Sequence, residues 1–298
     1  MDKIVLALGF FDGIHRGHAA LLEKTKQRAG ELGLAPAVFT FDRHPREVVT
    51  GQPMLLINSP EDRQEILHRL FGIDRVYVSR FDQAMMHMSG EEFIRRLLHE
   101  TYHAAHVVAG HDFHFGYQNQ GTPQLLRQCC AELGMGCDII PRVEREGITV
   151  SSTYIRGLLE QGEVERAGDF LGHPYGFSNT VVHGLHLGSR LGIPTVNLAI
   201  PQGTLPPRHG VYVSRVFFAD GRSVSSITNV GVRPTVGEGG KVNAESFLLD
   251  FSGDLYGQRL RLELYRFLRP EEKFPDLTAL QRQVQRDIAK TRAYFEEA

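Results

Sequence analysis

The sequence predicts two domains: a parallel α/β domain, followed by an antiparallel β-barrel that ends in a helix. Up to about residue 143, short apolar runs alternate with helical stretches, a pattern typical of a parallel sheet covered on both faces. Beyond about residue 172, strands follow one another at short intervals until one final helical stripe, which is typical of a barrel. The length of 298 residues also fits two domains.

The first element is a short apolar strand, Ile4 to Leu8, followed by a glycine-rich stretch from Gly9 to His18 and a helix from Ala19 to Ala29. Its glycines permit close approach of a ligand, and the N–H groups at the start of the helix attract an anion such as phosphate. His15 and His18 are three residues apart, so both can face one point. A turn with two surface histidines would give the same pattern. A zinc pair would as well, but no nearby ligands complete a set of four.

The rest of the first half supplies four more strands and three more helices. Ligands of such a sheet bind beyond the carboxyl ends of the strands, and His15 and His18 lie just past the first one. The predicted strands are 36–41, 75–81, 106–110 and 137–143, and the helices begin near Ser59, Ser89 and Pro123.

Two other stretches that follow strands carry chemical signals. Ser151, Ser152 and Thr153 open a helix with Arg156 one turn later, which predicts a phosphate clamp. A simple N-cap would explain only one of the three hydroxyls. Residues 110–116 place two aromatic rings among glycine and aspartate, which suits a flat ligand and equally suits a packed loop.

In the second half, residues 155–171 predict two short helices broken at Gly162, and a turn-rich boundary follows. Within the last predicted strand, leucines alternate with charged residues, as expected of a half-buried strand. The final helix should pack its apolar stripe on the barrel. The strands are 211–218, 224–232, 245–251 and 260–268, and the stripe is Leu277, Leu280, Val284 and Ile288.

Chemical signals in this half come from a glycine-rich stretch and from one acid. Residues 183–192 contain three glycines suited to a phosphate, and Thr195 and Asn197 follow on one strand face with oxygen ligands for Mg²⁺. The stretch lacks the pattern of a P-loop. Glu245 lies on an apolar strand face, so it is either at a strand end in water or functional.

Composition bounds the class of protein. Hydrophobic residues make up 42% and charged residues 23%, as in ordinary globular proteins, and the net charge of −2 gives no reason to expect a nucleic-acid partner. No apolar run approaches the ~20 residues of a membrane span. The N-terminus leads directly into a strand without a signal peptide. Three cysteines without zinc spacing suggest packing, and we expect a cytoplasmic protein.

Several motifs together resemble one family. His15-Arg16-Gly17-His18, with the lead-in from Gly9 to Gly13, is similar to the histidine signature of nucleotidyltransferases and most similar to FMN adenylyltransferases. Pro194-Thr195-Val196-Asn197 is similar to the Pro-Thr-Ala-Asn motif of riboflavin kinases. In the order of these motifs and in the share of the chain over which they occur, the sequence resembles the prokaryotic bifunctional riboflavin kinase/FMN adenylyltransferases, or FAD synthetases.

The resemblance implies a Rossmann-like nucleotidyltransferase domain at residues 1–170 and a barrel-shaped kinase domain at residues 171–298. It implies phosphorylation of riboflavin to FMN by the second domain, and adenylylation of FMN to FAD with release of pyrophosphate by the first. ATP is the co-substrate of both steps, with Mg²⁺. Riboflavin, FMN, FAD and ATP are the expected ligands, without nucleic acid or membrane.

The resemblance also implies roles for individual residues. Catalytic roles fall to His15, His18, Arg156 and Glu245, the last as the base for the riboflavin 5′-hydroxyl. Nucleotide contacts fall to Gly9, Phe10, Asp12, Gly17, Ser151, Ser152, Thr153, Gly184 and Gly188. Flavin contacts fall to Asp112, Phe113, Phe115, Gly116 and Arg269, and metal contacts to Thr195 and Asn197.

Three alternatives stay open. Only one of the two sites could be active, because Arg43 and Ser189 stand where the family usually has proline and arginine. The same frame could serve a non-catalytic flavin-binding protein, although such a protein has no need of a base. A tRNA-charging fragment is disfavoured by the lack of a basic surface signal and by the kinase-like second half.

Overall fold

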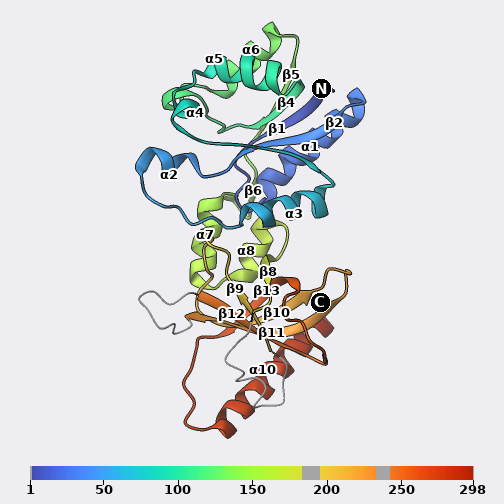
Figure 1. The fold of residues 1–298 in the computed structure, drawn as a ribbon, viewed down its shortest axis with the longest axis vertical. Coiled ribbons are helices and arrows are strands. Elements are labelled where there is room, and N and C mark those ends of the chain that lie inside the picture. Colours follow the sequence, from blue (N-terminus) through green and yellow to red (C-terminus); the bar gives the residue numbers. More distant parts are fainter. Residues whose placement is uncertain (1, 183–194, 233–241, 298) are drawn as a thin grey trace. The chain divides into compact units, whose positions relative to one another are not determined.

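The computed structural model describes residues 2–182, 195–232 and 242–297, which form two compact units (Figure 1). The first unit comprises Met1–Leu56 and Pro60–Ser152, and the second comprises Ile57–Ser59 and Thr153–Ala298. The elements of the first unit are β1 (Ile4–Leu8), α1 (Arg16–Leu32), β2 (Ala35–Phe41), α2 (Pro45–Thr50), α3 (Pro60–Phe71), β3 (Arg75–Ser79), α4 (Gln83–His87), α5 (Gly90–Glu92), the π-helical η1 (Phe93–Thr101), β4 (Ala104–Gly110), η2 (Tyr117–Asn119), α6 (Pro123–Glu132), β5 (Gly136–Ile140), β6 (Glu144–Arg145) and β7 (Ile148–Thr149).

The sheet of the first unit has five parallel strands in the order β3-β2-β1-β4-β5. Its central strand β1 is buried on both faces. Ile4, Leu6 and Leu8 pack in the core cluster that contains side chains of η1 and α6. Val5 and Ala7 pack in the cluster that contains side chains of α1 and α3. The predicted Rossmann-like sheet with helices on both faces is confirmed.

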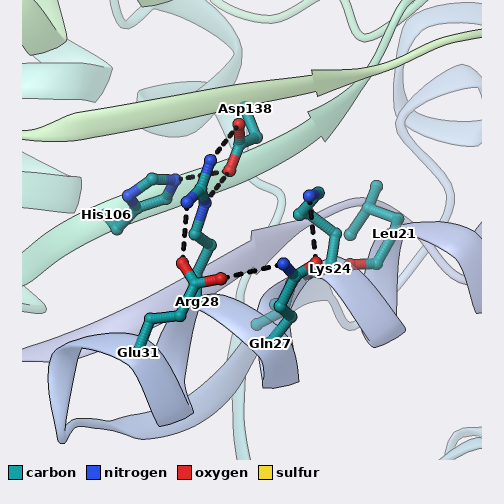
Figure 2. A network of polar contacts seen from close by, with 8 residues as sticks. Leu21, Lys24, Gln27, Arg28, Glu31, His106 and Asp138 are labelled. Carbon is teal, nitrogen blue, oxygen red and sulfur yellow. Dashed lines mark hydrogen bonds and ion pairs between the residues drawn. The ribbon is translucent and has the colours of Figure 1, made fainter.

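Helix α1 begins earlier than its apolar pattern predicts, because His15 caps it and Arg16 is already helical. It ends at Gly33 in the left-handed conformation, φ 65°, as glycine permits. A polar network ties α1 to the sheet (Figure 2). Arg28 Nε donates to Asp138 Oδ2 of β5 at 2.6 Å, and His106 Nε2 of β4 lies 2.9 Å from the same oxygen. The network lowers the pKa of Asp138, chiefly through the hydrogen bond from Arg28.

The second unit holds a six-stranded antiparallel sheet in the order β8-β13-β10-β11-β12-β9. The first and last strands of that order meet, because Val182 N–H donates to Asn197 O at 3.0 Å and Asn179 Nδ2 donates to Ala199 O at 2.8 Å. The sheet therefore curls into the predicted barrel, and α10 packs against β10 and β11. The elements are α7 (Ser152–Gln161), α8 (Val164–Leu171), β8 (Tyr175–Thr180), β9 (Thr195–Ala199), β10 (Gly210–Phe217), β11 (Ser223–Val232), β12 (Val242–Leu248), β13 (Arg259–Arg269) and α10 (Leu277–Glu297).

Two details of this unit differ from the sequence prediction. Strand β12 begins at Val242 and ends at Leu248, three residues earlier than expected, because Asp250 adopts φ 53° in a turn. Strand β8 was not predicted, and its first two residues, Tyr175 and Gly176, lie in the stretch that was interpreted as a boundary turn. The two short helices are confirmed, with the break at Gly162, φ 84°. Helix α8 packs on β8 and β13, and Arg266 Nη2 donates to Glu165 Oε1 at 2.8 Å.

Candidate active sites

The glycine-rich turn leaves β1 at the carboxyl edge of the parallel sheet. Phe11 and Ile14 are buried there with positive φ of 57° and 43°, values that non-glycine residues rarely adopt. Gly13 has φ 84°. A Cβ at Gly9 would lie 3.1 Å from the Phe11 ring, and one at Gly17 would lie 3.1 Å from the His15 ring. The turn is thus closely packed and strained, as functional loops often are.

His15 and His18 come together as predicted. Their rings are stacked, with centroids 3.7 Å apart and 12° between the planes. His15 Nδ1 accepts the backbone N–H of His18 at 3.3 Å, so the ring proton of neutral His15 is on Nε2, which can donate to a ligand. Burial lowers the pKa of His18 well below its usual value, and electrostatic interactions with His15 and with Arg63 lower it further. His18 is therefore a neutral imidazole at pH 7.

The predicted clamp lies partly against this turn. Ser152 Oγ donates to the carbonyl oxygen of Asp12 at 2.9 Å, so this hydroxyl holds the turn. Asp12 is 3% exposed. Ser151 is half-buried and precedes α7, whereas Thr153 and Arg156 belong to the second unit. Among the described residues no three His, Cys, Asp or Glu side chains form a metal-binding group, so the zinc alternative finds no support there.

The predicted flavin-side loop follows β4. Phe115 is 6% exposed and packs on Phe93 at a centroid distance of 5.2 Å, so it supports the loop from the core. Phe113 stacks on Phe115 at 5.3 Å and is itself half-buried. Gly116 has φ 73°, and a Cβ there would lie 2.6 Å from the backbone of Gly90. Asp112 is exposed on the same loop.

In the second unit, strand register places five side chains in one row. Asn197 of β9 pairs with Glu245 of β12, which pairs with Asn229 of β11. Asn229 pairs with Val211 of β10, which pairs with Arg269 of β13. Side chains in one row share a face of the sheet. Glu245 is the fourth residue of β12, so the strand-end explanation for this acid is wrong.

A cavity of about 390 Å³ lies over this row, between the sheet and α10. Its walls are mainly apolar, with carboxylates and one guanidinium at a few points, as in many sites for small ligands. The lining residues are Thr195, Val211, Ile227, Asn229, Glu245, Phe247, Arg269, Glu271, Glu272, Phe274, Leu280, Val284 and Asp287.

The opposite face of the same strands carries a cluster of four hydroxyl groups. Ser214 Oγ lies 2.7 Å from both Ser226 Oγ and Thr228 Oγ1, and Thr228 Oγ1 lies 2.7 Å from Ser246 Oγ. All four are fully buried. Because these groups satisfy one another inside the barrel, the face with Glu245 is the one available to a ligand.

Thr195 and Asn197 are two apart on β9 and share the face of Glu245. Asn197 is 6% exposed, and its Oδ1 accepts from Asn243 Nδ2 at 2.9 Å, which leaves one lone pair of that oxygen. A hydroxyl, an amide oxygen and a nearby carboxylate are the oxygen donors that Mg²⁺ prefers, so the residues present fit the metal. The predicted phosphate contacts Gly184 and Gly188 lie outside the described residues.

Three residues that line the cavity, Asn229, Glu271 and Asp287, were not predicted as site residues. Asn229 Nδ2 donates to Glu271 Oε1 at 3.0 Å. Arg269 Nη2 lies 2.9 Å from Asp287 Oδ2, and Asp287 is 1% exposed on α10. The pair fixes the guanidinium at the cavity wall. Nothing in the sequence marks Asp287 as the neighbour of Arg269 in space.

Two family models match separate parts of the chain. The family model described as FAD synthetase matches residues 1–154, and the one described as riboflavin kinase matches residues 171–295. A bifunctional riboflavin kinase/FMN adenylyltransferase from Pseudomonas fluorescens is 37% identical, over 97% of this chain and 92% of that protein. The protein of the same name from Escherichia coli strain K12 is 32% identical, over 99% and 93%.

A solved structure shares the whole fold. A crystal structure described as a macrolide-efflux protein from Streptococcus pneumoniae superposes with a TM-score of 0.86 at 30% identity, over 98% of this chain and 94% of that one. In the part of this chain that the structure describes, no helix is long and apolar enough to cross a membrane.

These matches first place the chain among the transferases of flavin cofactor synthesis. More narrowly, it belongs to the bifunctional riboflavin kinase/FMN adenylyltransferase family, since the relatives carry that name over nearly the full length of both chains.

Proposed function

We propose that this chain carries out both reactions of its family: riboflavin and ATP give FMN and ADP, and FMN and a second ATP give FAD and pyrophosphate. We assign the first reaction to residues 171–298 and the second to residues 1–170. The observation that carries the proposal is that each compact unit has its own chemically suitable site, the histidine pair in one and the row with Glu245 in the other.

The adenylyl step needs charge stabilisation more than a base, because the attacking phosphate of FMN is already an anion. His15 donates from Nε2, and neutral His18 donates beside it to oxygens of the α- and β-phosphates as negative charge spreads. Arg156 holds the departing pyrophosphate. The predicted contacts to nucleotide are Gly9, Phe10, Asp12, Gly17, Ser151, Ser152 and Thr153, and those to flavin are Asp112, Phe113, Phe115 and Gly116.

The kinase step does need a base, because an alcohol is a poor nucleophile. Glu245 takes the proton of the riboflavin 5′-hydroxyl while the flavin ring occupies the apolar part of the cavity. Arg269, fixed by Asp287, contacts the flavin. Thr195 and Asn197 hold Mg²⁺, which supplies charge neutralisation on the transferring phosphate when bound. Gly184 and Gly188 contact the nucleotide.

Partners and location follow from the same proposal. Both steps consume ATP, as expected of a cytoplasmic enzyme, and the net charge of −2 favours no nucleic-acid partner. The proposed reactions involve no membrane. The ligands are riboflavin, FMN, FAD and ATP.

One assay tests the proposal against its alternatives. The protein is incubated with riboflavin, ATP and Mg²⁺, and flavins are separated by chromatography over time. Two active sites should give FMN first and FAD later. FMN that is never converted to FAD would indicate that only the kinase site is active. FAD formed only from supplied FMN would indicate that only the adenylyl site is active. Binding of flavin without either product would indicate a non-catalytic protein.

A further inference from the structure

Arg63 of α3 is a buried arginine at the carboxyl edge of the parallel sheet, the edge at which the histidine pair lies. It is 2% exposed, and its guanidinium lies 4.5 Å from the centroid of the Phe10 ring. Nη1 donates to the carbonyl oxygen of Phe10 at 2.9 Å and to Thr40 Oγ1 at 3.0 Å. Thr40 Oγ1 in turn donates to the same carbonyl at 2.9 Å. Phe10, the residue directly before Phe11 with its positive φ, is thus held by both α3 and β2.

These contacts use only part of the guanidinium. Within the described residues, Nε and Nη2 of Arg63 are buried and donate to no acceptor. Burial lowers the pKa of Arg63, and the Asp12 carboxylate offsets part of that effect. A buried charge with unused donors is costly, and an apolar side chain would fill the same space more cheaply. Packing alone therefore does not explain an arginine here.

The strained turn next to Arg63 explains better why an arginine occupies this buried position. Phe11 and Ile14 hold positive φ values, and such a conformation persists only where the surroundings fix it. Ile14 immediately precedes His15, so release of the Phe10 carbonyl would let the histidine pair move. A displacement of about 1 Å at a reacting centre can cost about 10²-fold in rate.

We propose that Arg63 is the positioning residue of the adenylyl site, which clamps the Phe10 carbonyl and so holds His15 and His18 in their stacked arrangement. The inference rests on the proposed adenylyl function of this site. The positive charge of Arg63 has a second effect, which is on the titration of His18. The pKa of His18 is lowered first by burial, then by His15, and the positive charge of Arg63 lowers it further.

The test uses full-length Arg63→Met and Arg63→Lys, with Arg69→Met as the matched control, since Arg69 is exposed on the same helix. The rates of FAD formation from FMN and of FMN formation from riboflavin are measured separately. Thermal unfolding is followed, and the His18 ring is titrated by NMR. Arg63→Met should lower kcat for FAD formation about 10²-fold and raise the titration midpoint of His18. It should leave riboflavin phosphorylation within about twofold of the parent rate.

The lysine variant separates clamping from general stability. Arg63→Lys keeps the positive charge, so the titration midpoint of His18 should stay at the parent value. Because lysine lacks the planar guanidinium with its several donors, kcat for FAD formation should still fall about 10-fold or more. Arg69→Met should match the parent. Parent-like kcat in Arg63→Lys, or an unchanged His18 midpoint in Arg63→Met, would overturn the inference. If Arg63→Met does not fold, the lysine result decides alone. A parent protein that makes no FAD refutes the proposed function instead, and the His18 titration still tests Arg63.

Discussion

Replacement of Glu245 by glutamine is the sharpest test of the kinase site. The change removes the ability to accept the hydroxyl proton but keeps size and polarity. Its neighbours in the row, Asn197 and Asn229, are neutral amides, so no cross-strand ion pair is lost. The free energy of unfolding should therefore change by less than ~0.5 kcal/mol, as for changes that disturb no buried network. Loss of a general base typically lowers the rate by ~10²–10⁴, or ~2.7–5.4 kcal/mol in activation free energy.

The small expected change in stability and the large expected loss of rate can be distinguished in one protein preparation. FMN formation is followed by chromatography, riboflavin binding by flavin fluorescence, and unfolding by thermal denaturation. Glu272→Gln is the matched control, because Glu272 is an exposed carboxylate that lines the same cavity and the charge change is identical. The assignment of Glu245 is refuted if Glu245→Gln phosphorylates riboflavin near the parent rate, or if Glu272→Gln loses as much.

Three further predictions concern the two units. His18→Ala should lower FAD formation from FMN by about 10² or more and leave FMN formation unchanged; normal FAD synthesis would remove His18 from the site. Because the pKa of His18 is lowered in the fold, the unfolded chain binds its proton first as pH falls below about 6.5, so acidification destabilises the fold. His18→Asn should therefore show a smaller drop in unfolding temperature between pH 7.5 and 5.5 than the parent; equal drops would contradict the lowered pKa. A fragment of residues 153–298 should fold and phosphorylate riboflavin without making FAD, and one of residues 169–298 should be less stable because it lacks most of α8; a folded but inactive 153–298 fragment would refute the division of labour.

Much of the fold could be predicted from local patterns. Alternation of strand and helix gave the doubly covered sheet, because strands as apolar as β1 can be stable only when buried on both faces. The two-residue alternation of Leu260, Leu262 and Leu264 predicted β13, because successive side chains of a strand point to opposite faces of the sheet. Strand β8 was missed because Tyr175 to Thr180 carries glycine, serine and asparagine, which favour turns when read locally. Its pairing with β13 overrides that preference.

The histidine pair could also be predicted, because His15 caps helix α1 and His18 lies in the first turn of that helix. Their stacking and the neutral state of His18 could not, since the first depends on the strained turn and the second on burial and on Arg63. Alternation correctly placed Glu245 on the face of Phe247, but the partners of Glu245 depend on register. Register is set by β9, β11 and β12 together, and a shift of one residue would turn Glu245 to the other face.

The residues that escaped prediction have one physical property in common: they act across long separations in sequence. Arg63 and Phe10 are 53 positions apart and are joined through a backbone carbonyl, which leaves no mark on residue type at either end. Asp287 reaches Arg269 from a different element, and on its helix it looks like any surface acid until burial is known. The groups that bear the chemistry lie in short motifs because their mutual geometry is set by one turn or one strand. The groups that hold that geometry are distributed over the fold, so in this chain they are the ones that only the structure can supply.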